Sequence, residues 1–311
     1  MTKYLVTGGA GFIGSHIVER LVRDGHSVRV LDNFYSGKRQ NLAPFASEIE
    51  IIEGDIRRPE DCKHACQGVE IVYHEAAVPS VPKSVEDPLT SHEANITGTF
   101  NVLMAARDAG CRRVIFAASS SAYGDLPDLP KRETACPAPL SPYAVAKLAG
   151  EAYLRAFRTC YGLETLALRY FNVFGPRQDP ASQYAAAIPA FVSAILKGEP
   201  PTIFGDGEQT RDFTHIDNVV HANMLAAQTP NANGQVMNIA CGERVSVNQI
   251  IGLINQLLGK NVAPKYVDAR PGDVKHSLAD ISLAREVLGY EPLLMFEEGL
   301  RRAIDWYREN L

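Results

Sequence analysis

The stretch YLVTGGAGFIGSHIVERL, which begins at Tyr4, constrains the fold more than any other part of the 311-residue chain. A short apolar run leads into Gly8, Gly11 and Gly14, spaced three residues apart, and an amphipathic helical pattern follows. Glycines at such a turn let a ligand approach the backbone closely, and the start of the next helix offers unpaired N–H groups to a pyrophosphate. The following apolar run ends in Asp32, at the distance typical of dinucleotide-binding units. The stretch therefore predicts a dinucleotide site on a strand–turn–helix unit.

Asp32 also distinguishes between the two common dinucleotides. A carboxylate can accept hydrogen bonds from both ribose hydroxyls of NAD, whereas it would repel the 2′-phosphate of NADP. We therefore expect NAD as the cofactor. Asp55 and the small residues Ala76 and Ala77 follow later strands and should face the same crevice, although each of them alone is equally compatible with a structural role.

Alternating apolar and helical patterns predict the fold class. Runs rich in Val and Ile lie at residues 3–9, 27–33, 49–55, 70–77 and 112–120, and helical patterns such as 14–26 and 95–111 lie between them. This alternation is typical of an α/β fold with a Rossmann-like, doubly wound parallel sheet. Beyond residue 175, proline and glycine become frequent. We expect an NAD-binding Rossmann domain over residues 1–175 and a smaller C-terminal α/β substrate lobe over residues 176–311, with some later segments returning to the first domain.

Composition narrows the classes of partner. The chain is 46% hydrophobic, and its formal charge of −5 gives no basic surface for nucleic acid or an anionic membrane. No apolar run is long enough to span a bilayer, so we expect a soluble cytoplasmic protein. The six cysteines show no paired metal-ligand spacing, and we expect no metal site.

A tyrosine and a lysine one helical turn apart are the candidate catalytic groups. Tyr143 and Lys147 lie in SPYAVAKLAG, and the cluster from Ser119 to Ser121 ends a buried strand shortly before it. A free phenol has a pKa near 10, but an adjacent ammonium and a cationic nicotinamide would both lower that pKa. The alternative is a surface phenol beside a solvated lysine.

The motifs TGGAGFIGS, Ser119 to Ser121, YAVAK and RYFNVFGP together resemble those of the extended short-chain dehydrogenase/reductases, and within them the nucleotide-sugar (UDP-GlcNAc/UDP-glucose) 4-epimerases. The resemblance implies that Tyr143 takes the proton of the sugar 4-hydroxyl while hydride leaves C4 for NAD. Ser119 would hydrogen-bond the same oxygen, with Ser121 beside it, and Lys147 would hold the nicotinamide ribose. The implied cofactor-binding residues are Gly8, Gly11, Phe12, Ile13, Gly14, Asp32, Asn33, Ser36, Gly37, Asp55, Ile56, Ala76, Ala77, Tyr143, Lys147 and Tyr170.

The same resemblance suggests which UDP-sugar is bound. Ser277 follows RPGDVKH at a position where epimerases limited to glucose and galactose carry a bulky tyrosine, so its small side chain leaves room for an N-acetyl group. We expect NAD-dependent conversion of UDP-N-acetylglucosamine to UDP-N-acetylgalactosamine; the alternatives are a UDP-glucose 4-epimerase or another extended short-chain dehydrogenase that acts on a nucleotide sugar. The implied substrate-binding residues are Ser80, Ser119, Tyr143, Asn172, Gln178, Ala186, Arg211, Arg270, Asp273 and Ser277.

Three other functions fit the sequence less well. The related 4,6-dehydratases carry an Asp–Glu pair after the catalytic threonine, where this chain has Ser120 and Ser121, and UDP-glucuronate decarboxylases usually carry a glutamate there. A non-catalytic NAD sensor on the same fold would lack part of the tyrosine, lysine and serine set, all of which is present.

Two helical segments, residues 91–110 and 145–162, carry apolar residues on more than one face. Members of the resembling family pair two such helices from each subunit. We expect a homodimer; burial of both faces within one subunit is the alternative.

Overall fold

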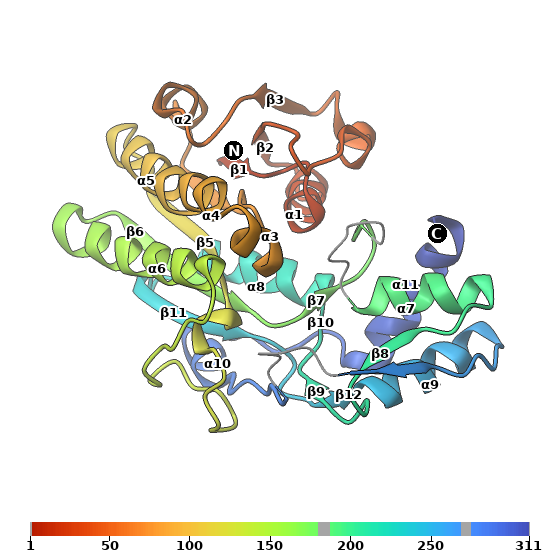
Figure 1. Cartoon of the computed structure of the whole chain (residues 1–311). Coiled ribbons are helices and arrows are strands. Elements are labelled where there is room, and N and C mark those ends of the chain that lie inside the picture. The colour runs from red at the N-terminus through yellow and green to blue at the C-terminus, as the bar shows by residue number, and fades with distance from the viewer. Residues whose placement is uncertain (1, 180–186, 269–274, 311) are drawn as a thin grey trace.

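A seven-stranded parallel sheet forms the centre of the computed structural model, which describes residues 2–179, 187–268 and 275–310 (Figure 1). Its strands are β1 (Lys3–Thr7), β2 (Ser27–Asp32), β3 (Ile49–Glu53), β4 (Ile71–His74), β5 (Arg113–Ser119), β6 (Glu164–Tyr170) and β11 (Asn233–Ile239). They lie in the order β3-β2-β1-β4-β5-β6-β11, and every neighbouring pair is parallel. The direction of winding reverses between β1 and β4, which is where open sheets of this kind bind ligands. The predicted doubly wound parallel sheet is confirmed.

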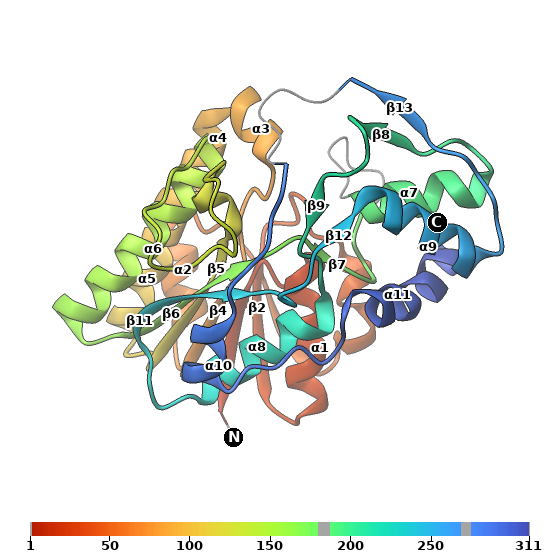
Figure 2. The ribbon, with the colours of Figure 1, turned by 90° about the horizontal axis from the view of Figure 1, so that it is seen from below.

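Helices cover both faces of this sheet and make three layers (Figure 2). The helices around the sheet are α1 (Phe12–Arg23), α2 (Pro59–Cys66), α3 (Val81–Glu86), α4 (Pro88–His92), α5 (Gly98–Asp108), α6 (Pro142–Tyr161), α8 (Ile216–Gln228) and α10 (Ser282–Leu288). Side chains of α1, α8 and α10 form one core and those of α2, α5 and α6 form the other. Successive strand residues such as Ile115 and Phe116 enter opposite cores, which is why the strands are continuous apolar runs in the sequence.

Short helical turns complete the first half of the chain. The 3₁₀ turns are η1 (Arg39–Asn41), η2 (Ala43–Phe45) and η4 (Ser120–Tyr123), and a π-helical turn, η3 (Glu93–Thr97), joins α4 to α5. Cys62 and Cys66 of α2 are buried in the core against α5. Within the described residues, no helix combines the length and the apolar character needed to cross a membrane.

A third core defines the smaller lobe. Its helices and strands are α7 (Ala187–Lys197), α9 (Val247–Leu258), α11 (Phe296–Asn310), β7 (Val173–Phe174), β8 (Thr202–Phe204), β9 (Thr210–Arg211), β10 (Thr214–His215), β12 (Val245–Ser246) and β13 (Lys265–Val267). The strands pair two by two, as β7 with β10, β8 with β13 and β9 with β12. Residues 216–239 and 282–288 lie between parts of this lobe in sequence, yet they form α8, β11 and α10 of the large unit. The second half of the chain therefore contributes to both units.

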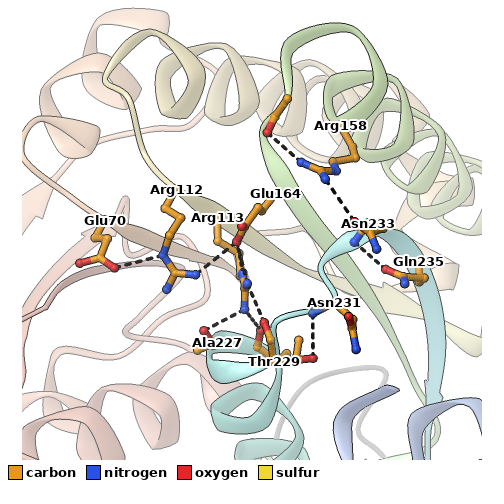
Figure 3. Close-up of polar contacts among 12 residues, drawn as sticks. Glu70, Arg112, Arg113, Arg158, Glu164, Ala227, Thr229, Asn231, Asn233 and Gln235 are labelled. Atoms are coloured by element: carbon orange, nitrogen blue, oxygen red, sulfur yellow. Dashed lines mark hydrogen bonds and ion pairs between the residues drawn. The ribbon is translucent and has the colours of Figure 1, made fainter. Parts of the chain in front are cut away.

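A buried arginine fixes the returning segment to the sheet (Figure 3). Arg113, at the start of β5, is 1% exposed. Its guanidinium donates hydrogen bonds to the carbonyl oxygens of Ala227 at 2.8 Å and Thr229 at 2.7 Å, and it lies 2.6 Å from the Glu164 carboxylate. The last carbonyl groups of a helix have no hydrogen-bond donors within the helix. Arg113 supplies donors to the carbonyl groups at the end of α8 and so joins this helix to β5 and β6.

Candidate active site

The glycine turn between β1 and α1 has no room for side chains. Gly8 has a φ of +68°, and a Cβ atom there would lie 2.7 Å from the Cα of Ala76. A Cβ at Gly14 would lie 2.2 Å from the carbonyl oxygen of Gly8. Gly11 caps α1 without a side-chain hydrogen bond, so the N–H groups of the first turn, from Phe12 onward, face the turn without an acceptor from their own helix. This cradle fits the pyrophosphate of a dinucleotide.

Asp32 lies at the end of β2 beside this turn. Its two carboxylate oxygens accept hydrogen bonds from the backbone N–H groups of Ala10 at 2.9 Å and Phe34 at 2.8 Å. Burial raises the pKa of Asp32, and these two hydrogen bonds oppose that rise. A Cβ at Gly37 would lie 2.9 Å from the Asp32 Oδ1, so the loop after β2 needs glycine at this position. Each oxygen keeps a lone pair, so the carboxylate can still accept from a ribose.

Asp55 follows β3 and lies next to the loop that carries Asn33 and the exposed Ser36. The Asn33 Nδ2 donates to the Asp55 Oδ2 at 2.9 Å, and Arg57 forms an ion pair with the same carboxylate at 2.7 Å. Burial opposes ionisation of Asp55, but the bonds from Arg57 and Asn33 outweigh it and hold its pKa at about 2. Ile56 is buried behind it. These predicted cofactor-binding residues thus lie along the ends of β2 and β3.

Tyr143 and Lys147 lie in the first two turns of α6. Ser141 caps this helix by accepting a hydrogen bond from the backbone of Ala144 at 3.2 Å, and the Tyr143 N–H donates to the Ser84 Oγ of α3 at 3.1 Å. The Lys147 ammonium donates to the carbonyl oxygen of Ala117 in β5 at 2.6 Å and lies 5.9 Å from the centre of the Tyr143 ring. The two side chains are therefore held at the carboxyl end of β5.

Burial dominates the electrostatics of Tyr143 and Lys147 in the chain alone. Burial is the main cause of a Tyr143 pKa raised to about 12; a hydrogen bond with Ser119 lowers it and the charge of Glu75 raises it further. Burial also lowers the Lys147 pKa to about 8. The expected lowering of the Tyr143 pKa includes the charge of the nicotinamide and stays a prediction for the NAD complex; in the chain alone, burial of the phenol outweighs its polar neighbours. The positive charge of the nicotinamide ring, when NAD is bound, would favour the phenolate form of Tyr143.

The serine cluster adjoins the tyrosine. The Ser121 Oγ donates to the Ser119 Oγ at 2.9 Å, and the Ser121 N–H donates to the same oxygen at 3.2 Å. Ser119, which also hydrogen-bonds Tyr143, is therefore the member of the cluster placed to share an oxygen with it.

The structure brings together two of the predicted substrate residues. Arg211 lies on β9, and its guanidinium donates to the carbonyl oxygens of Thr210 and Lys275. The Ser277 N–H donates to the carbonyl oxygen of Thr210 at 3.0 Å, so Ser277 lies beside the strand that carries Arg211.

Three further predicted substrate residues, Asn172, Ser80 and Gln178, lie on separate segments of the chain. Asn172 has a φ of +35°, and its side-chain amide donates to the carbonyl oxygen of Asp212 at 3.0 Å. Ser80 caps α3, and the Gln178 amide donates to the carbonyl oxygen of Val173 at 2.9 Å. Ala186, Arg270 and Asp273 lie outside the described residues.

Three polar residues near this site were missed by the sequence analysis. Ser84 anchors the start of α6, as described above. Glu75 directly follows β4 and accepts a hydrogen bond from the Tyr170 hydroxyl at 2.9 Å; Asn223 of α8 donates to that hydroxyl at 2.8 Å. The sequence could have indicated Glu75, because this charged residue directly follows a buried strand in the segment HEAA. We singled out only Ala76 and Ala77 there.

Comparison with known proteins supports this interpretation. Residues 4–240 match the model of the NAD dependent epimerase/dehydratase family. A protein of Methanocaldococcus jannaschii named as a putative UDP-glucose 4-epimerase is 40% identical over 308 residues, which are 98% of each chain.

Solved structures agree over the whole chain. A UDP-N-acetylglucosamine 4-epimerase from Methanobrevibacter ruminantium M1, in complex with UDP-N-acetylmuramic acid, is 43% identical, covers 100% of this chain and 99% of its own, and superposes with a TM-score of 0.95. The UDP-glucose 4-epimerase of Thermus thermophilus, in complex with NAD, is 36% identical, with both chains fully covered and a TM-score of 0.91.

The predicted family and cofactor are confirmed. The glycine cradle and Asp32 fit NAD, and the three relatives described above, which match over the full length, are named as UDP-sugar 4-epimerases, which are isomerases. The chain belongs to the NAD-dependent epimerase/dehydratase family, as an extended short-chain dehydrogenase/reductase of the UDP-sugar 4-epimerase kind.

Proposed function

We propose that the protein interconverts UDP-N-acetylglucosamine and UDP-N-acetylgalactosamine by transient oxidation at C4. The observation that carries this choice of sugar is the position of Ser277. Its side chain is half-buried, and the residue lies beside Thr210, which is on β9 together with Arg211. In epimerases limited to glucose and galactose the matching position carries a tyrosine. A hydroxymethyl group there leaves the volume of a phenol ring free for an N-acetyl group.

The roles of the reacting residues follow from their contacts. NAD, when bound, supplies the hydride acceptor and then the hydride donor for C4. Tyr143 takes the proton of the 4-hydroxyl as hydride leaves C4, and returns it to the same oxygen as hydride comes back to the opposite face of C4, so the net reaction is redox-neutral. Ser119 hydrogen-bonds the same oxygen, and Lys147 supplies positive charge beside the phenol.

The diphosphate is assigned to Arg211 and Asn172, with Arg270 in the same role. A guanidinium can give two parallel hydrogen bonds to phosphate oxygens. Arg211→Lys keeps the charge and loses this fork, so it should raise KM for the UDP-sugar more than it lowers kcat. Equal kcat/KM values for Arg211→Lys and the parent would refute the assignment.

The choice of sugar is tested by incubating the protein and NAD with UDP-N-acetylglucosamine, UDP-glucose or UDP-glucuronate and separating the products by anion-exchange chromatography. We expect the highest kcat/KM with UDP-N-acetylglucosamine. UDP-glucose is the second candidate, since two relatives 40% and 38% identical are named for it. Rapid formation of UDP-galactose without any UDP-N-acetylgalactosamine would select that second candidate.

The proposed role of Ser277 has its own test. Ser277→Tyr should lower kcat/KM for UDP-N-acetylglucosamine by about 100-fold and leave UDP-glucose turnover within a few-fold. Ser277→Ala, which adds no volume, is the matched control and should retain both activities. If Ser277→Tyr reduces both activities equally, the residue does not select the sugar.

We also propose that the protein is a homodimer joined through α5 and α6. Large apolar side chains are exposed on these helices and the adjoining α4, among them Leu89 at 66%, Val145 at 48% and Tyr153 at 37%. The Phe100 and Tyr153 rings lie 5.3 Å apart across the α5–α6 contact. Large exposed apolar patches are uncommon on monomeric proteins, and a second copy of the same face would cover these side chains.

Light scattering after size-exclusion chromatography tests the dimer. We expect twice the 34.0 kDa mass of the chain for the parent and the single mass for Tyr153→Glu, because the new carboxylate would be desolvated in the interface. Tyr266→Glu places the same change on β13, where the tyrosine is 53% exposed, and should remain dimeric. A monomeric parent protein would refute the proposal.

A further inference from the structure

Glu75 is a carboxylate held in one position by residues from two neighbouring elements. It lies directly after β4 and is half-buried. The Tyr170 hydroxyl at the end of β6 donates to its Oε1 at 2.9 Å, and the Asn223 amide of α8 donates to that hydroxyl at 2.8 Å. Asn223 is itself fully buried. This chain of two hydrogen bonds restricts the carboxylate to the carboxyl edge of the sheet.

A buried cation, Lys147, lies at the same edge. In the pairing of β4 with β5, His74 lies opposite Phe116, so Glu75 emerges beside Ala117, whose carbonyl oxygen accepts a hydrogen bond from Lys147 at 2.6 Å. Lys147 is 3% exposed. A carbonyl alone does not balance a buried ammonium, because removing the charge from water costs more than one hydrogen bond returns.

A second carboxylate near Lys147 already has a partner. Glu151 lies one turn further along α6 and accepts hydrogen bonds from the Arg169 guanidinium at 2.8 and 2.7 Å. Arg169 therefore balances most of the Glu151 charge. Tyr170, the residue that holds Glu75, is a neutral donor. Among the described residues, Glu75 is the carboxylate at this edge whose charge remains for Lys147.

We propose that Glu75 is the counter-ion of Lys147: a positioning residue that keeps the lysine protonated and acts through it on Tyr143. The inference deepens the proposed function, on which the role of Lys147 rests, by naming what maintains its charge. It also explains the Tyr170–Asn223 hydrogen bonds, since these residues restrain the position of the Glu75 carboxylate.

The directions of the pKa shifts agree with this geometry. Burial raises the pKa of Glu75 to about 7, against the hydrogen bond from Tyr170 and the charge of Lys147. Burial lowers the pKa of Lys147 to about 8, and Glu75 is the largest influence in the opposite direction, ahead of Glu151. The titratable groups that face Glu75 from the packed elements are Tyr73 of β4, Tyr143 and Lys147 of α6, and Tyr170 of β6.

The experiment follows the titration of Lys147 directly, by NMR of the full-length chain labelled with ¹³C at lysine Cε, with and without added NAD. Lys147→Met assigns the signal. Glu75→Gln keeps the acceptor for Tyr170 and removes the charge, and it should move the Lys147 midpoint to lower pH by about one unit or more. Glu75→Asp keeps the charge on a side chain that is one methylene shorter, so the Lys147 midpoint in this variant should stay closer to that of the parent.

Glu133→Gln is the matched control. Glu133 is also a half-buried carboxylate and accepts a hydrogen bond from the Asn238 N–H at 2.7 Å, but it lies outside this cluster. Its removal should leave the Lys147 midpoint unchanged. In the pH profile of kcat/KM, the alkaline limb should move to lower pH in Glu75→Gln and not in Glu133→Gln.

A Glu75→Gln midpoint equal to that of the parent would overturn the proposal. So would a larger shift in Glu75→Asp than in Glu75→Gln, because that order indicates a packing role. If Glu75→Gln does not fold, Tyr170→Phe serves instead: loss of its donor should raise the pKa of Glu75 and lower the Lys147 midpoint, and an unchanged midpoint would refute the inference. The titration needs no sugar, so it stands or fails independently of the epimerase assay.

Discussion

The close packing of the glycine turn predicts that a single added methyl group at Gly14 destabilises the fold and weakens NAD binding. In Gly14→Ala, the new Cβ would lie 2.2 Å from the carbonyl oxygen of Gly8 and 2.9 Å from the Cα of Gly9. Both contacts are with backbone, so no side-chain rotation can relieve them, and α1 must move away from the turn. Overpacking of this kind costs about 1–3 kcal/mol. If the cradle must close again to bind NAD, the same energy weakens the affinity about 5- to 150-fold.

Gly252→Ala provides the matched control. Gly252 also lies inside a helix, α9, but a Cβ there meets nothing within 4 Å. Alanine in an open helical position stabilises by about 0.5–1 kcal/mol relative to glycine. Urea unfolding and calorimetric titration with NAD should therefore show Gly252→Ala more stable with unchanged affinity, and Gly14→Ala less stable with weaker affinity. Similar behaviour of the two variants would refute the argument that the cradle excludes a Cβ.

Three further perturbations have defined outcomes. Arg113→Met leaves the carbonyl groups at the end of α8 without their donor, while the Glu164 carboxylate keeps Arg112 as a partner, so the free energy of unfolding in urea should fall by about 1–3 kcal/mol; a loss below about 0.5 kcal/mol would contradict the role of this network. Burial between Thr7 and Thr99 lowers the pKa of His74 to about 3, so the unfolded chain binds the extra proton below about pH 6.5. His74 alone should therefore remove about 3 kcal/mol of stability between about pH 7.5 and 4.5, and the change in stability over this range should differ by about that amount between His74→Gln and the parent; equal pH dependence would contradict it. Ser84→Ala should lower kcat several-fold with little change in NAD affinity, since Ser84 holds the Tyr143 backbone, and an unchanged kcat would show that this contact is dispensable.

The sheet and the cofactor site were readable from the sequence because local patterns encode them. A parallel strand buried on both faces is a continuous apolar run, and a turn such as that at Gly8 and Gly14 accepts only glycine. Asp32 could likewise be predicted, since it ends a strand at a characteristic distance from the turn. These features depend on residues close together in the chain.

The rest depends on contacts between distant residues. The return of β11 to β6 depends on Arg113, which is over a hundred residues away from the carbonyl groups it binds. The raised pKa of Tyr143 comes from burial of the phenol, a quantity that the spacing of Tyr143 and Lys147 does not contain. Glu75 could be seen in the sequence as a charged residue at a strand end, but its partner Tyr170 lies 95 residues further on.

The most direct test of the account follows the hydrogen on C4 of the sugar. The UDP-hexose that the protein turns over is prepared with deuterium at C4 and incubated with enzyme and NAD in ordinary water. Transient oxidation at C4 with Tyr143 as the proton acceptor predicts that the epimerised product retains the deuterium, and that Tyr143→Phe slows conversion by about 10²- to 10⁴-fold. Loss of the deuterium to solvent, or full turnover by Tyr143→Phe, would contradict it.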